Sequence, residues 1–255
     1  MDSVGDVLSV AEMVEERRLL VDVAHRLLGC RIAAGSVVDE VYRRWYGLSE
    51  GERAKIGQPR SWLVTNAREV CLPRLAGPPN ERSGTPGESA ARWFRVRERV
   101  VQPEPEPEPE PEGDDYECPD CVSHSARTRH TRPTTQQHAA LSGALRDACM
   151  AQATEALAAL LAPDVSVFFD GGGKVRTLAH PVHGSRRGAR SLSILLAPQR
   201  RTVLDTRPVN GRTGLVVRHD RQTAAVLTLD VAGSHVIQVW VTLNPDKLRS
   251  WNRPA

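Results

Sequence analysis

Residues 103–112 repeat the dipeptide Pro-Glu five times, and this stretch limits what the chain can fold into. Alternating proline removes every second backbone donor and fixes φ, so neither a helix nor a central strand can form there. Like-charged glutamates extend the segment further, and polyproline II geometry makes it a stiff spacer about 30 Å long. We therefore predict a multidomain chain: a helical domain over 1–100, a disordered Pro-Glu-rich linker over 101–137 and an α+β domain over 138–255.

The composition fits a cytoplasmic protein. A chain of 255 residues can hold two modest domains that each bury a core. The N-terminus lacks the basic region of a signal peptide, and the longest apolar runs, such as 156–162, are too short to span a bilayer. The five cysteines are odd in number and scattered, which argues against a disulfide scaffold. We expect no membrane association, and no motif predicts a cofactor.

The first hundred residues carry the periodicity of short amphipathic helices. Apolar residues recur at helical spacing over 19–28, and Gly29 is a plausible stop. A second amphipathic run covers 37–45. Ser49 followed by Glu52 predicts a capping box that opens a third, short helix. A last helix should begin at Pro59 and run to about Cys71, before Pro73 bends or ends it. Four short helices predict a compact bundle.

Three segments of this bundle carry a resemblance to a known family. The stretches ERRLLVDVAHRLLG, VVDEVYRRWYGLSEGERAKI and PRSWLVTNAREVCLPRL resemble region 2 of RNA polymerase sigma factors of the extracytoplasmic-function group, over roughly 15–75. The resemblance implies that the first helices dock on the RNA polymerase core and that the last helix reads the −10 element of promoter DNA. The implied polymerase-binding residues are Asp39, Glu40, Arg43 and Arg44, and the implied DNA-binding residues are Arg60, Arg68 and Arg74.

The chain departs from the pattern of this family at several positions. Residues 33–36 read Ala-Ala-Gly-Ser where the family has an acidic block. Glu69 stands where the family has an arginine. On a helix face that contacts DNA phosphates, a carboxylate repels the phosphates that an arginine would attract. Two alternatives stay open within the bundle: Trp45 and Trp62 are either core aromatics or base-stacking platforms, and the Arg43-Arg44 pair is either functional or a solvated helix face.

The interval 76–137 shows no sequence pattern of a helix-turn-helix. Family members carry one here, as region 4, to read the −35 element, and such a motif needs two apolar-periodic helices around a short turn. One charged helix over 88–101 is the most that the sequence predicts, so region 4 is absent. The same interval holds one metal-like cluster, which is either a zinc site or a set of reduced thiols in a flexible tail. Its members are Cys118, Cys121, His124 and His130.

The last part of the chain reads as an α+β domain with helices preceding most of the strands. One amphipathic helix is expected over 138–161 and a second over 184–196. The short connections between the last strands predict antiparallel hairpins, and a curved sheet wrapped around helices gives an α+β cone. The expected strands are 165–169, 213–218, 224–230 and 235–243.

Three motifs in this part, DGGGK (170–174), VNGRTGLVVR (209–218) and NPDKL (244–248), carry a second resemblance. They are similar to the SnoaL-like domain, the cone of polyketide cyclases related to nuclear transport factor two, and to the C-terminal extension of one sigma-factor subgroup. The resemblance implies a regulatory contact with the sigma core, whereas the local chemistry is equally that of two well-capped turns. The implied interface comprises Asp170, Gly171, Gly172, Gly173, Lys174, Asn244, Pro245, Asp246, Lys247 and Leu248.

An enzyme of this fold would need an acid–base pair within reach of a substrate. We expect no enzyme, since three glycines beside Asp170 favour a solvent-exposed carboxylate rather than one buried in a pocket. The candidate acid–base residues are Asp170, His180, His183, Asp230 and His235.

These observations favour a sigma-factor-like transcription regulator, with region 2 degenerate and region 4 absent. Its expected partners are the RNA polymerase core, promoter DNA or another regulatory protein. The alternative is a protein-interaction or small-molecule-sensing regulator that no longer binds promoters. A third hypothesis, a SnoaL-type enzyme, rests on fold analogy alone.

Overall fold

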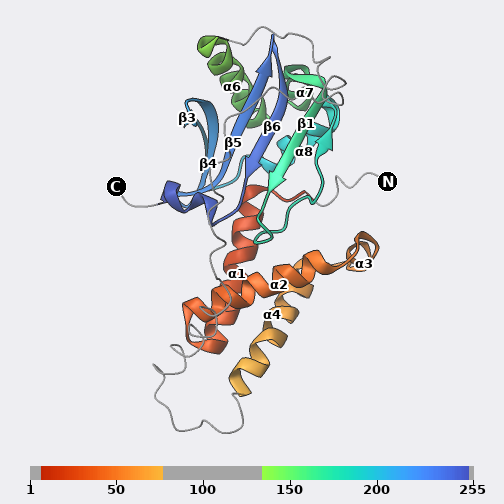
Figure 1. The fold of residues 1–255 in the computed structure, drawn as a ribbon, viewed down its shortest axis with the longest axis vertical. Coiled ribbons are helices and arrows are strands. Elements are labelled where there is room, and N and C mark those ends of the chain that lie inside the picture. Colours follow the sequence, from red (N-terminus) through yellow and green to blue (C-terminus); the bar gives the residue numbers. More distant parts are fainter. Residues whose placement is uncertain (1–6, 77–133, 253–255) are drawn as a thin grey trace, which may run out of the picture. The chain divides into compact units, whose positions relative to one another are not determined.

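The computed structural model of the chain describes residues 7–76 and 134–252 (Figure 1). We call 7–76 the helical segment and 134–252 the α+β segment. The described residues up to Leu72 and the whole α+β segment belong to one compact unit. The predicted spacer, the charged helix over 88–101 and the cluster Cys118, Cys121, His124 and His130 lie outside the described residues.

The helical segment contains four helices with sequence-encoded ends. A capping box between Ser9 and Glu12 opens α1, and Gly29, with φ of 67°, ends it in the left-handed conformation that glycine adopts easily. The predicted capping box between Ser49 and Glu52 is present at the start of α3. The helices are α1 (Val10–Leu28), α2 (Arg31–Gly47), α3 (Glu50–Lys55) and α4 (Pro59–Ala76).

A core of its own holds these helices together. Leu20 of α1, Val41 of α2 and Leu63 of α4 are fully buried within it. Trp45 is 3% exposed and meets Trp62 edge-on, with ring centroids 5.4 Å apart. Both tryptophans therefore contribute to packing, and an edge-to-face pair of this kind adds about 1 kcal/mol beyond its buried area.

Two helices extend beyond their predicted limits. Helix α2 begins at Arg31 and runs through Gly35 and Ser36, six residues ahead of the amphipathic run predicted over 37–45. Burial of Ala34 and Val37 outweighs the low helix propensity of one glycine, and the Ser36 hydroxyl donates to the carbonyl of Ala33. Helix α4 continues through Pro73 to Ala76, so the expectation of an end near Cys71 was wrong.

The α+β segment contains a six-stranded sheet in the order β2-β1-β6-β5-β4-β3 (Figure 1). Strand β1 is parallel to β6, and the other neighbours are antiparallel, which confirms the predicted hairpins. Its elements are α6 (Thr135–Met150), α7 (Thr154–Leu160), β1 (Leu161–Asp170), β2 (Val182–His183), α8 (Ser185–Leu195), β3 (Thr202–Val209), β4 (Arg212–His219), β5 (Gln222–Ala232), β6 (His235–Thr242) and η3 (Lys247–Asn252).

Three details differ from the sequence prediction. The helix expected over 138–161 is two helices, because the chain turns at Gln152, whose φ is 53°. Helix α6 also starts at Thr135, inside the stretch assigned to the linker. Strands β2 and β3 were not predicted; β3 contains Pro208 and lies at the sheet edge, where a missing backbone donor is tolerated.

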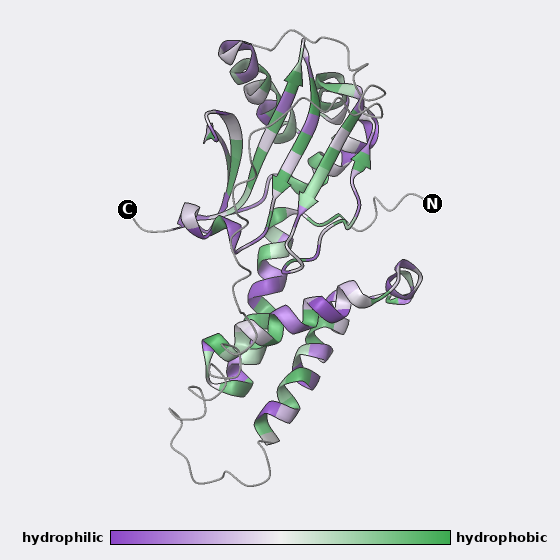
Figure 2. Cartoon of the chain, in the orientation of Figure 1, coloured by the Kyte–Doolittle hydropathy of each residue, from purple (hydrophilic) through white to green (hydrophobic). Residues whose placement is uncertain are grey.

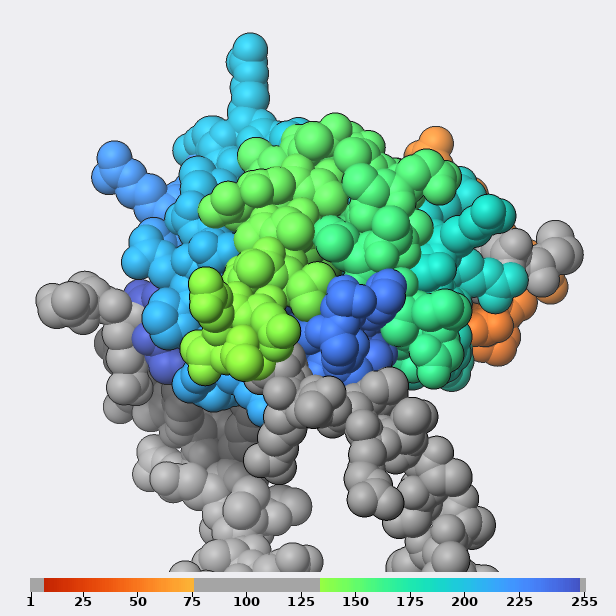
Figure 3. Space-filling model, turned by 90° about the horizontal axis from the view of Figure 1, so that it is seen from above, coloured from red at the N-terminus to blue at the C-terminus, as the bar shows by residue number. Residues whose placement is uncertain are grey.

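Hydrophobic residues recur along the strands and the helices packed against them (Figure 2). Leu145 of α6, Leu192 of α8 and Leu227 of β5 are fully buried in this core. Seen end-on in Figure 3, α6 (yellow-green) lies beside the β5–β6 turn (blue). His138 of α6 hydrogen-bonds the carbonyl of Leu229 in β5. None of the described helices is both long and apolar enough to cross a bilayer.

The first turns of α1 belong to the core of the α+β segment. Val10 and Met13, 1% and 3% exposed, pack with the sheet residues, whereas Leu20 and Ala24 of the same helix pack with α2 and α4. Helix α1 therefore contributes to the cores of both the helical segment and the α+β segment, and so holds the two segments in contact.

Candidate regulatory interface

The DGGGK and NPDKL motifs form two loops that contact each other. Lys174 of the first motif pairs with Asp246 of the second at 2.5 Å. Lys247 of the second motif pairs with Asp170 of the first at 2.8 Å. Gly172 lies against Asn244 so closely that a Cβ on the glycine would be 2.2 Å from the amide nitrogen of Asn244. The structure thus brings both predicted motifs together, and we call residues 170–174 and 244–248 the two-loop cluster.

Hydrogen bonds within each loop fix its shape. The Asp170 carboxylate accepts the backbone N–H of Gly172 at 3.0 Å, and the Asn244 side-chain oxygen accepts the N–H of Asp246 at the same distance. Both are Asx turns, in which a side chain replaces a backbone acceptor. Leu248 is 3% exposed and packs with Val209, Val216 and Val226. The loops are therefore held in place before any partner binds.

The ion pairs of the two-loop cluster shift the pKa values of their members. The hydrogen bond to Asp246 raises the pKa of Lys174, and the same bond lowers the pKa of Asp246 below its usual 3.8. Each group is therefore held in its charged form, Lys174 as a cation and Asp246 as an anion.

We expect acid to destabilise this interface. A carboxylate with a lowered pKa stabilises the fold fully above its ordinary pKa, and that contribution disappears as the pH falls through the folded value. The pKa of Lys174 is raised, so its contribution to stability is fully present below its ordinary pKa of 10.5 and is lost only as the pH rises through the folded value. The melting temperature should therefore fall as the pH drops from about 5 to about 3. An Asp246→Asn variant should show a flatter acid limb in thermal unfolding, and an unchanged limb would contradict this assignment.

Lys174 also connects the two-loop cluster to the helical segment. Its ammonium group lies 3.2 Å from Asp39 of α2. Arg17 of α1 pairs with the same carboxylate at 3.3 Å and donates to the carbonyl of Lys174 at 2.7 Å. Asp39, a predicted polymerase-binding residue, is therefore bound by a residue of the predicted regulatory interface.

A buried polar centre adjoins this contact. Arg176, 8% exposed, donates from Nη2 to Glu16 Oε2 at 2.9 Å, and Glu16 of α1 is 3% exposed. The Tyr42 hydroxyl donates to Glu16 at 3.4 Å, and the Arg176 guanidinium lies 5.8 Å from the ring centroid of Trp45. Burial raises the pKa of Tyr42, so its hydroxyl stays protonated and donates. We call this the Glu16–Arg176 centre.

Tyr46 of α2 extends the same contact. Its hydroxyl donates to the carbonyl of Val175 at 2.7 Å and accepts the backbone N–H of Thr177 at 2.9 Å. Neither Glu16 nor Arg176 was among the predicted site residues. One signal was present: Glu16 falls at helical spacing between Met13 and Leu20, on the face that is otherwise apolar.

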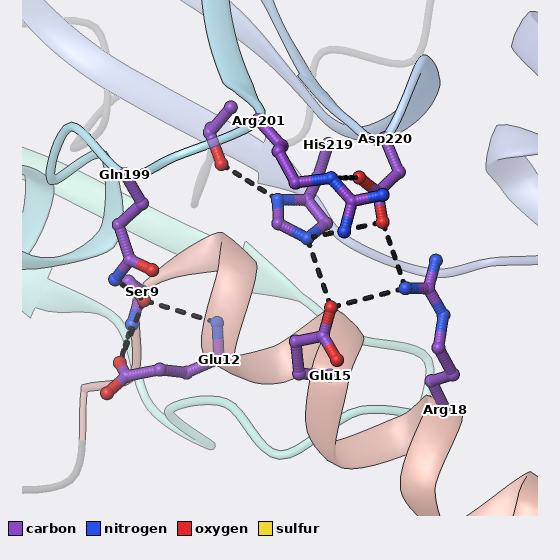
Figure 4. A network of polar contacts seen from close by, with 9 residues as sticks. Ser9, Glu12, Glu15, Arg18, Gln199, Arg201, His219 and Asp220 are labelled. Atoms are coloured by element: carbon purple, nitrogen blue, oxygen red, sulfur yellow. Dashed lines mark hydrogen bonds and ion pairs between the residues drawn. The ribbon is translucent and has the colours of Figure 1, made fainter.

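A second set of polar contacts joins α1 to the turn between β4 and β5 (Figure 4). Arg18 pairs with Asp220 at 2.9 Å, and Glu15 lies 3.3 Å from Nε2 of His219. Asp220 and Arg221 have φ of 51° and 67°, a conformation for which glycine is usual. Arg201 also pairs with Asp220, and the hydrogen bond from Arg18 lowers the pKa of that carboxyl. These pairs hold a turn whose backbone is strained.

Three of these groups have the chemistry of metal ligands. Ligand atoms of Glu15, His219 and Asp220 lie within 4.8 Å of one another, and Thr202 contacts the other ring nitrogen of His219 at 2.8 Å. A cation there would have to displace guanidinium groups, because Arg18 pairs with both carboxylates. We therefore assign no metal to this cluster.

The remaining predicted residues of the helical segment are on its surface. Glu40 of α2 pairs with Arg43 and, at 3.4 Å, with Arg44, so one predicted polymerase-binding residue is paired with two others. On α4, the predicted DNA-binding residues Arg60, Arg68 and Arg74 are exposed, and so is Glu69.

The candidate acid–base residues do not converge on one place. Asp170 belongs to the two-loop cluster, Asp230 pairs with Arg212 at 3.5 Å, and the exposed His183 contacts Ser166. His180 lies 3.7 Å from Glu50 of α3, and His235 is exposed at the start of β6. The structure shows no shared substrate position for them within the described residues.

Comparison with solved structures finds similar chains at low sequence identity. No family model matches the chain, and no curated protein matches it. The chain is similar to a structure of the Mycobacterium tuberculosis extracytoplasmic function sigma factor SigJ, with 20% identity over 94% of this chain and 98% of that chain and a TM-score of 0.35. An NTF2-like protein of unknown function from Cytophaga hutchinsonii is 15% identical, over 47% of this chain and 97% of that chain, with a TM-score of 0.32. A Mycobacterium tuberculosis LEH-like epoxide hydrolase is 14% identical, over 46% of this chain and 90% of that chain, with a TM-score of 0.31.

Proposed function

We propose that the chain is a cytoplasmic, sigma-factor-like transcription regulator that acts through RNA polymerase or promoter DNA. In this proposal the α+β segment regulates the helical segment within the same chain. The observation that carries the proposal is the contact of Lys174 with Asp39 at 3.2 Å. It joins a motif similar to a regulatory sigma-factor extension to a residue that corresponds to the polymerase-binding surface of region 2.

The charge on α2 explains how such regulation would work. Asp39 and Glu40 are the carboxylates that remain on this helix, because 33–36 lack the acidic block of the family. Lys174 and Arg17 neutralise Asp39, while Arg43 and Arg44 neutralise Glu40. A basic polymerase surface would therefore meet little free negative charge, and releasing Lys174 would restore part of it.

The test measures affinity for the RNA polymerase core. We expect Lys174→Ala to increase the affinity of the full chain by about two- to fivefold, the range of a partly exposed ion pair. Biolayer interferometry on immobilised bacterial core enzyme gives this value. Lys247→Ala is the matched control, because Lys247 pairs with Asp170 inside the two-loop cluster and is 64% exposed.

Two outcomes would overturn the proposal. One is that the core enzyme captures neither the wild type nor Lys174→Ala. The other is that both lysine variants change the affinity equally, since the contact with Asp39 would then have no particular effect. Asp39→Asn should weaken binding in the Lys174→Ala background, where this carboxylate is free of the lysine.

A further inference from the structure

A cavity of about 400 Å³ lies between α1 and the α+β segment. Val14 and Val21 of α1 line one side, and Val175, Leu243 and Leu248 line the other. Its volume falls within the range of small-molecule sites, which are mostly apolar with a few convergent polar groups. All of these residues belong to the same compact unit.

This cavity is separate from the interior that a cone-shaped fold would offer to a ligand. The space between the sheet and helices α6 and α8 is filled by fully buried side chains, among them Leu145, Leu192 and Leu215. The cavity lies instead at the junction with α1, next to Pro245 and Leu248 of the two-loop cluster. A ligand there would contact α1 and the two-loop cluster at once.

One arginine at the cavity is available to an anion. Arg17, Arg18 and Arg31 line it together with one carboxylate, that of Asp22. Arg17 and Arg18 already pair with Asp39 and Asp220. Arg31 is exposed at the start of α2, and no carboxylate of the described segments pairs with it. Its guanidinium can therefore bind an anionic group of a ligand.

We propose that this junction cavity binds a small amphipathic anion of the acyl-carboxylate class. The apolar chain packs against the valine and leucine side chains, and the carboxylate pairs with Arg31. Binding stabilises the contact between α1 and the α+β segment, because the ligand contacts both. This site does not depend on polymerase binding, so it stands or falls independently of the proposed function.

Calorimetric titration of the full chain with decanoate tests the proposal. We expect saturable binding of one decanoate per chain, together with a rise in melting temperature at saturating ligand. Decan-1-ol has the same apolar chain without the charge and should bind at least about tenfold more weakly. Decyltrimethylammonium, which carries the opposite charge, should not bind. Absence of saturable decanoate binding, or equal binding of all three, would overturn the proposal.

Two variants locate the site. Arg31→Gln should weaken decanoate binding by about tenfold. Arg26→Gln is its matched control, because Arg26 is also exposed on the helical segment but does not line the cavity. Val14→Trp should abolish binding by filling the cavity, with circular dichroism as the check of folding. If Arg31→Gln binds decanoate as tightly as Arg26→Gln does, the assignment of the carboxylate to Arg31 is wrong.

Discussion

Replacing Arg176 with alanine should lower the free energy of unfolding by about 3–5 kcal/mol, the range for breaking a buried ion pair by removing one partner. The variant leaves the Glu16 carboxylate buried, with the hydroxyl of Tyr42 as its remaining hydrogen-bond partner among the described contacts. A buried charge without a counter-ion is much less favourable than the same charge in water. Urea denaturation, with the slope checked for a two-state transition, gives the value.

The control is an ion pair of the same chemistry on the surface. Arg146 pairs with Asp147 at 2.7 Å, but the two side chains are 36% and 67% exposed. Arg146→Ala should therefore change the free energy of unfolding by less than about 1 kcal/mol. The double variant Glu16→Gln with Arg176→Met should regain part of the loss, because it removes the unpaired charge. Similar losses in Arg176→Ala and Arg146→Ala would show that burial of the centre is not decisive.

The ends of helices and the hairpins could be predicted from the sequence because their causes are local. Ser49 and Glu52 are three residues apart, and their reciprocal capping bonds need nothing beyond that spacing. Gly29 ends α1 because glycine accepts a positive φ. The β4–β5 and β5–β6 hairpins follow from short connections between apolar runs.

The start of α2 could not be predicted in the same way. Gly35 and Ser36 are weak helix formers, and local propensity favours a break there. The helix continues because Ala34, Val37 and Val38 are all fully buried against the neighbouring helices. Strand β3 was missed for a related reason: its residues alternate poorly and include Pro208, but pairing with β4 along its whole length gives it a regular conformation.

In the candidate site, too, local features could be predicted from the sequence and long-range contacts could not. The DGGGK and NPDKL motifs are recognisable because each is a compact run of turn residues and charges. The Glu16–Arg176 centre cannot be recognised from the sequence, because its two members are separated by 160 positions and no local pattern relates them. The contact of Lys174 with Asp39 likewise depends on the packing of α1 and α2 against the α+β segment. The sequence therefore identifies residues of the site but not which of them contact one another.

Replacing Gly172 with alanine should lower the free energy of unfolding by about 2–4 kcal/mol, from two causes that add. Its φ of 58° is unfavourable for a residue with a Cβ, and that Cβ would lie 2.2 Å from the amide nitrogen of Asn244. Asn244 cannot easily move aside, because its side-chain oxygen accepts the N–H of Asp246, which pairs with Lys174. Thermal and urea unfolding of the full chain measure the loss.

The neighbouring glycine separates the two causes. Gly173 has φ of 64°, but no atom lies within 4 Å of the position its Cβ would occupy. Gly173→Ala should therefore show the backbone effect alone, about 1–2 kcal/mol. Combining Gly172→Ala with Asn244→Ala should reduce the cost of the Gly172 substitution to that same value, because the clash is gone. Equal losses in the two single glycine variants would mean that the contact between the two motifs contributes nothing, and that their shared geometry does not depend on Asn244.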